Sequence, residues 1–171
     1  MPSPELLSKE CLCIVGGSQG RDDAHKYVDT NWNIWCVARI YDAVPYATMV
    51  FDMHQDATHR NRNTFNAHRD GKLVLQYPVE YFPDALILPT PEIIDEFGAA
   101  FTSSFSWMIA YGLYLGMKQI ALCGVNMSHE SELDAQRPGL FYILGFARAR
   151  GVEIILPEFS QLRTEVKFAT N

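Results

Sequence analysis

Short apolar runs alternate along the chain with segments of helical periodicity. The runs are almost continuously apolar, as in strands that a parallel sheet buries on both faces. Alternation of such strands with helices is typical of an α/β domain with crossover connections. We therefore predict strands at residues 12–15, 34–38, 48–51, 73–75, 120–123 and 154–156.

Two helices are predicted from the residues at their ends. The first begins at the Thr-Ser-Ser run of residues 102–104, which favours the N-cap, and ends at Gly116. The second begins at Pro138, which suits the first helical position, and ends at Gly151. These ends place helices before and after the strand at residues 120–123.

Two further segments give no clear element. Residues 55–71 are polar and ambiguous, and residues 78–91, which contain four prolines, are predicted to wind as a loop. No repeat or linker divides the chain, so residues 1–171 are predicted to form a single domain. We expect a Rossmann-like α/β fold with a mostly parallel sheet of about five to six strands and helices on both faces.

A glycine-rich turn follows directly on the first strand and precedes a polar, helical stretch that begins near Asp22. Glycines allow close approach of a ligand, and the N–H groups of a following helix can bind phosphate. The spacing is neither GxGxxG nor a P-loop, so a tight connection stays open as the alternative. The candidate nucleotide-binding residues of this turn are Gly16, Gly17, Ser18 and Gln19.

Ligands of an open parallel sheet bind beyond the carboxyl ends of its strands. Asp52 and His54 follow the third strand with Met53 between them, so their two side chains emerge on one side. His54 could act as a base that Asp52 orients, or the pair could bind a divalent metal. A strand end capped by backbone is the alternative.

Other polar residues are expected at the same edge. Ser103 and Ser104 begin a helix whose N–H groups could bind phosphate, although capping alone explains them. Asn126 could contact a base or a sugar hydroxyl, although asparagine also suits a turn after Gly124. The remaining residues at strand ends include Arg39, Glu158 and Ser160.

Composition narrows the class of protein. The chain has 171 residues, 48% of them hydrophobic, and a formal net charge of −6, which argues against general nucleic-acid binding. The basic cluster of residues 59–62 with His68 and Arg69 could meet an anionic ligand, although a solvated helix face or loop also explains it. Open sheet edges and 12% aromatic residues are compatible with a homodimer.

Cysteine use and hydropathy indicate a soluble protein. No apolar run reaches the roughly 18 residues that a membrane helix needs, and the N-terminus lacks a signal-peptide pattern. We therefore expect neither export nor membrane association. The four cysteines lie in apolar, strand-like runs without zinc-ligand spacing, so we expect buried free thiols and no metal site formed by cysteines.

Several short segments together resemble a family of small Rossmann-like proteins encoded by tailed bacteriophages. They are WNIW at 32–35, FDMH at 51–54, TSSFSWM at 102–108, GVNM at 124–127 and QRP at 136–138. The resemblance covers nearly the whole chain. This family has no settled activity, and it distantly resembles CMP-sialic-acid-dependent sialyltransferases and pterin diphosphokinase-like proteins.

The resemblance implies a nucleotide site formed by the first turn, with Gly16 and Ser18, and by the helix start at residues 103–104. The phage proteins usually carry Gly-Thr-Ala-Pro-Ser in the first turn, so Gly17 and Gln19 depart from their pattern. Asn126 stands where those proteins commonly have aspartate. His54 is suggested by its position at a strand end and matches no catalytic motif of the sialyltransferases.

We therefore expect a phage protein of the host cytoplasm that binds a nucleotide or nucleotide-sugar and requires no identified cofactor. As a glycosyltransferase-like enzyme it would use His54 as base and Asp52 to orient it. Two alternatives stay open. One is a non-catalytic protein that sequesters a nucleotide or host signalling molecule, and the other is a virion or assembly component that kept the fold.

Overall fold

The fold is seen in a computed structural model, which describes residues 9–54, 61–127 and 134–163. Its strands form one seven-stranded sheet in the order β5-β4-β3-β2-β1-β6-β7, and every neighbouring pair is parallel. This confirms the predicted α/β, Rossmann-like class, with a slightly higher strand count. The strands are β1 (Cys11–Val15), β2 (Trp32–Val37), β3 (Met49–Asp52), β4 (Leu73–Leu75), β5 (Leu86–Ile87), β6 (Gln119–Cys123) and β7 (Glu153–Ile155).

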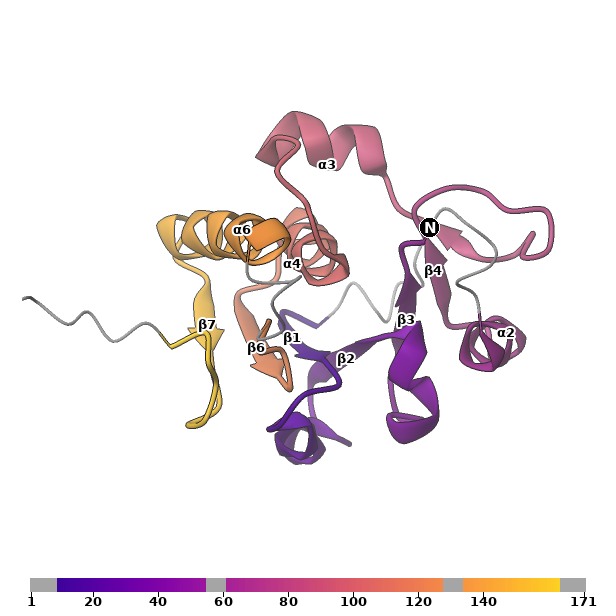
Figure 1. The fold of residues 1–171 in the computed structure, drawn as a ribbon, viewed down its shortest axis with the longest axis horizontal. Coiled ribbons are helices and arrows are strands. Elements are labelled where there is room, and N and C mark those ends of the chain that lie inside the picture. Colours follow the sequence, from indigo (N-terminus) through magenta and orange to yellow (C-terminus); the bar gives the residue numbers. More distant parts are fainter. Residues whose placement is uncertain (1–8, 55–60, 128–133, 164–171) are drawn as a thin grey trace, which may run out of the picture.

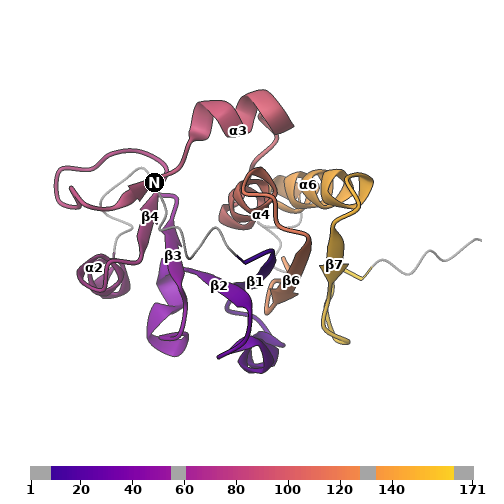
Figure 2. The ribbon, with the colours of Figure 1, turned by 180° about the vertical axis from the view of Figure 1, so that it is seen from behind.

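Helices cover both faces of the sheet, as Figures 1 and 2 show from opposite sides. One face carries three α-helices, which are α3 (Thr90–Phe97), α4 (Ser104–Tyr114) and α6 (Arg137–Ala149). The other carries two 3₁₀ helices and one α-helix, which are η1 (Arg21–Tyr27), η2 (Ala38–Ala43) and α2 (Arg62–Arg69). Within the described ranges, no helix combines the length and apolar character needed to cross a bilayer.

Each face of the sheet buries its own hydrophobic core. Along β1, Leu12 and Ile14 pack into the core beneath α3, α4 and α6, whereas Cys13 and Val15 pack into the core beneath η1, η2 and α2. Successive side chains of a strand point to opposite faces, so a strand covered on both sides needs apolar residues at every position. This explains the continuous apolar runs in the sequence.

The cysteines follow the same pattern. Cys13, Cys36 and Cys123 are buried free thiols, as predicted, whereas Cys11 is half-buried. The Sγ atoms of Cys13 and Cys123 lie 3.8 Å apart on neighbouring strands. Burial raises the pKa of Cys36 to about 12, so this thiol stays protonated and acts as a small apolar side chain in the core.

The loop prediction for residues 78–91 was wrong in part. Strand β5 forms inside this segment, and α3 begins at Thr90 with Pro91 in its first turn. A two-residue strand is too short to show periodicity, and a proline in the first turn is compatible with a helix because no intrahelical N–H is lost there. The ambiguous segment 55–71 contains α2, whose N-cap Asn61 accepts hydrogen bonds from the N–H groups of residues 63 and 64.

The glycine-rich turn packs against the loop after β6. The N–H of Gly16 donates to the Cys123 carbonyl at 2.8 Å, and the N–H of Ser18 donates to the Gly124 carbonyl at 2.9 Å. A Cβ atom on Gly16 would collide with the carbonyl oxygen of Gly124. The segment that follows is the seven-residue 3₁₀ helix η1 and not an α-helix. Close approach of two backbones therefore accounts for the glycine at position 16.

We predict that Gly16→Ala destabilises the protein, because the new methyl group meets backbone that no rotamer change can move. Overpacking of this kind costs about 1–3 kcal/mol, occasionally more. Urea unfolding would measure the loss. The matched control is Gly145→Ala in α6, where a Cβ meets no atom within 4 Å beyond the neighbouring backbone of its own helix, and helix propensity favours alanine. Equal stability of the Gly16 variant and the parent would contradict the packing argument.

Candidate functional site

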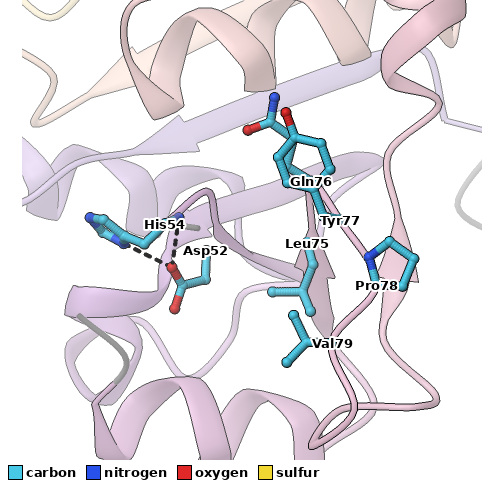
Figure 3. A pocket seen from close by; sticks show the side chains of 7 residues that line it. All are labelled: Asp52, His54, Leu75, Gln76, Tyr77, Pro78 and Val79. Carbon is cyan, nitrogen blue, oxygen red and sulfur yellow. Dashed lines mark hydrogen bonds and ion pairs between the residues drawn. The ribbon is translucent and has the colours of Figure 1, made fainter. Parts of the chain in front are cut away.

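A buried carboxylate lies at the carboxyl end of β3. Asp52 is 3% exposed, and its Oδ1 atom lies 2.8 Å from Nδ1 of His54 and accepts the His54 backbone N–H at 3.2 Å. Its Oδ2 atom accepts the hydroxyl of Thr64 at 2.8 Å. Figure 3 shows the two contacts between Asp52 and His54. The two side chains thus lie together, as the alternation along the strand predicted.

This arrangement determines how the imidazole can act. A carboxylate can only accept hydrogen bonds, so the contact with Asp52 places a proton on Nδ1 and leaves Nε2 of a neutral His54 as an acceptor. The His54 side chain is 55% exposed, whereas Asp52 is buried behind it. A histidine oriented by a buried carboxylate can take up a proton from a ligand hydroxyl.

Thr64 is the member of this group that sequence reasoning missed. It is fully buried in α2, which brings it to Asp52 from twelve residues further along the chain. The only local signal is Asn61, an N-cap residue three positions earlier, and it lies in a segment without clear periodicity. The contact becomes visible only when α2 is placed against β3.

Two cavities adjoin the Asp52–His54 pair, and both are lined by these two residues. The β3–β4 cavity measures about 440 Å³, and the β2–β3 cavity measures about 290 Å³. The β3–β4 cavity is completed by residues 75–79, at the carboxyl end of β4. The β2–β3 cavity is completed by residues from the ends of β2 and β3 and from the starts of η2, α2, α4 and α6.

The β2–β3 cavity collects groups that favour an anion. Asn61 is the N-cap of α2, Ser104 is the first residue of α4, and Gln136 is the N-cap of α6. The start of a helix carries partial positive charge, although the N–H groups of residues 63, 64 and 106 already donate to the capping side chains of Asn61 and Ser103. Arg39, an exposed residue just after β2, adds a full positive charge to the same lining. A phosphate or carboxylate group suits this combination.

The glycine turn lies outside the lining of both cavities. None of Gly16, Gly17, Ser18 and Gln19 is among the described residues that line them. Phe105 connects the two regions, because it lines the β2–β3 cavity while a methyl group on Gly16 would lie 3.1 Å from its Cζ atom. The turn therefore borders the site through Phe105.

The other predicted residues are engaged in structural contacts. The hydroxyl of Ser103 accepts the N–H of Ser106 at 3.1 Å, which makes Ser103 the N-cap of α4. The Asn126 amide donates to the Gln19 carbonyl at 3.3 Å and accepts the N–H of Gln161 at 3.3 Å. These contacts match the capping and turn interpretations. Of the two serines predicted at the start of this helix, Ser104 lines the β2–β3 cavity and Ser103 does not.

The structure also bears on the remaining candidates. Within the described residues, no group of three or more histidine, cysteine, aspartate or glutamate side chains could hold a metal ion. In the basic cluster, residues 59 and 60 lie outside the described residues, whereas Arg62 and Arg69 lie exposed on α2. Gln76 and Tyr77, which sequence reasoning did not single out, line the β3–β4 cavity.

Comparison with known proteins gives no match to a family model, a curated protein or a solved structure.

We predict that Thr64→Val destabilises the protein, because it removes a buried donor from the Asp52 carboxylate while keeping the side-chain volume. Hydrogen bonds to charged groups contribute about 1.5–3 kcal/mol, and the free energy of unfolding should fall by that amount. Denaturant titration would measure it. Thr64→Ser keeps the hydroxyl and is expected to lose less. A Val variant as stable as the parent would show that the hydroxyl is dispensable to Asp52.

Proposed function

We propose that the protein binds a nucleotide or nucleotide-sugar, with its phosphate in the β2–β3 cavity. The observation that carries this proposal is the meeting of Arg39 with the N-cap residues of α2 and α6 and the first residue of α4, beside His54. Helix N-termini and an arginine are the groups that proteins use to bind phosphate. The resemblance to tailed-phage proteins supports the same class of ligand, in a protein that acts in the host cytoplasm.

As an enzyme, the protein would carry out a glycosyltransferase-like transfer. Nε2 of His54 would take the proton of an acceptor hydroxyl, whose oxygen forms a bond to the anomeric carbon of the nucleotide-sugar. The bond from that carbon to the phosphate oxygen breaks, and its electron pair leaves with the nucleotide. Asp52 would stabilise the imidazolium, and Arg39 with the helix N-termini would stabilise the departing phosphate.

A binding protein without chemistry is the second candidate. The observation that favours it is the 55% exposure of the His54 side chain, because transfer to an acceptor other than water requires water to be excluded. Sequestration of a nucleotide or a signalling molecule requires only the anion site. A component of the virion that kept the fold is the third candidate, and it requires no ligand at all.

Ligand binding tests the proposal directly. We predict that nucleotides or nucleotide-sugars raise the midpoint of thermal unfolding, because a ligand of the folded state stabilises it. Arg39→Gln should weaken this binding about tenfold to a hundredfold, as expected for loss of a hydrogen bond to a charged group. Arg148→Gln, an exposed position in the last turn of α6, is the control. No stabilisation by any nucleotide would favour the virion component.

Turnover separates the enzyme from the binding protein. If the enzyme interpretation is right, chromatography will show nucleotide released from a nucleotide-sugar in the presence of an acceptor. His54→Ala should then slow release about 10²- to 10⁴-fold while leaving nucleotide affinity within about twofold. His25→Ala, an exposed histidine of η1, is the control. Release at the parent rate in the His54 variant would refute its role as base.

A further inference from the structure

The larger β3–β4 cavity has no part in the anion site just proposed, although it shares Asp52 and His54 with it. Asp52 is paired with Leu75 in the register of β3 and β4, so residues 76–79 leave the sheet beside the carboxylate. Figure 3 shows Gln76, Tyr77, Pro78 and Val79 grouped on one side of the view, with the Asp52–His54 pair on the other.

The lining of the β3–β4 cavity differs in charge from that of its neighbour. Among the described residues that line it there is no lysine or arginine, and no helix begins there. The shared residues Asp52 and His54 are already engaged with each other at 2.8 Å. This cavity therefore offers nothing that favours a phosphate, and its occupant is expected to be uncharged.

The side chains of this lining suit a flat ring. Tyr77 is 45% exposed and provides an aromatic face, and Pro78 and Val79 follow it in the lining. The amide of Gln76 offers both a donor and an acceptor, which is the pairing that the polar edge of a nucleobase requires. Bases stack on aromatic side chains through their faces and are read by hydrogen bonds at their edges.

We propose that the β3–β4 cavity is the nucleobase subsite of the nucleotide whose phosphate occupies the β2–β3 cavity. This inference rests on the proposed function and deepens it. Asp52 and His54 line both cavities. In a nucleotide that fills both cavities, the pentose would therefore lie beside this pair. The base then lies against Tyr77 with its edge toward Gln76, and the phosphate lies near Arg39.

Calorimetric titration of the full chain tests this arrangement. The probes are the four nucleoside 5′-monophosphates, UDP, UDP-glucose and inorganic phosphate. For the nucleotides that bind the parent, Tyr77→Ala should weaken affinity about fivefold to a hundredfold, as loss of one base-stacking contact predicts. Gln76→Ala should reduce the differences in affinity among the four nucleoside monophosphates. Inorganic phosphate, which reaches only the β2–β3 cavity, should bind both variants as it binds the parent.

Two controls separate the subsite from general effects on the loop. Tyr81→Ala removes an aromatic ring that is 74% exposed, four residues further on and outside the cavity lining, and should leave nucleotide affinity unchanged. Tyr77→Phe keeps the ring and should retain binding. Thermal unfolding without ligand verifies that each variant is folded.

The outcomes distinguish this inference from the proposed function. Nucleotide binding that Arg39→Gln weakens, but that neither Tyr77→Ala nor Gln76→Ala changes, would overturn the nucleobase subsite and leave the anion site standing. A loss in Tyr77→Ala that affects UDP-glucose and not UDP would assign the cavity to the sugar and also overturn the inference. Absence of binding by every probe to the parent would overturn both.

Discussion

The candidate site depends on the burial of one carboxylate. Asp52 lies at the end of β3 with almost no contact with water, and an unpaired charge in such a place is strongly destabilising. Its oxygens are satisfied by the hydroxyl of Thr64, the N–H of His54 and the imidazole of His54. Compensation of this charge thus holds α2 against the sheet and fixes the orientation of the histidine between the two cavities.

Much of the fold could be predicted from the sequence because the sheet is buried on both faces. Strands β1, β2, β3, β4, β6 and β7 were each recognisable as apolar runs, and α4 and α6 had clear end residues. The signals failed where the elements are short or polar. Strand β5 has two residues, and α2 buries only Thr64 and Ala67 in an otherwise exposed or half-buried helix.

The site was predictable to the extent that its geometry is local. Asp52 and His54 are two residues apart on an extended segment, so their proximity follows from the pleat. Thr64, Gln76 and Tyr77 reach the pair through the packing of α2 and β4 against β3, which no local pattern encodes. The glycine turn shows the opposite case: it has the composition of a phosphate loop, yet the N–H groups of Gly16 and Ser18 donate to the carbonyls of Cys123, at the end of β6, and Gly124. The anion site we propose lies at the ends of the next two strands of the sheet, β2 and β3.

The contact between Gly16 and Gly124 also bears on how this protein can diverge. Each glycine faces the backbone of the other. A side chain introduced at one position therefore collides with backbone atoms, which no second substitution can remove. The left-handed φ of +68° at Gly124 adds an independent constraint on that position. Descendants of this chain that keep the fold are therefore expected to keep both glycines even after losing every ligand. Retention of the glycine-rich turn in such a lineage would therefore be explained by the packing of β1 against β6 and would not show that an activity has been kept.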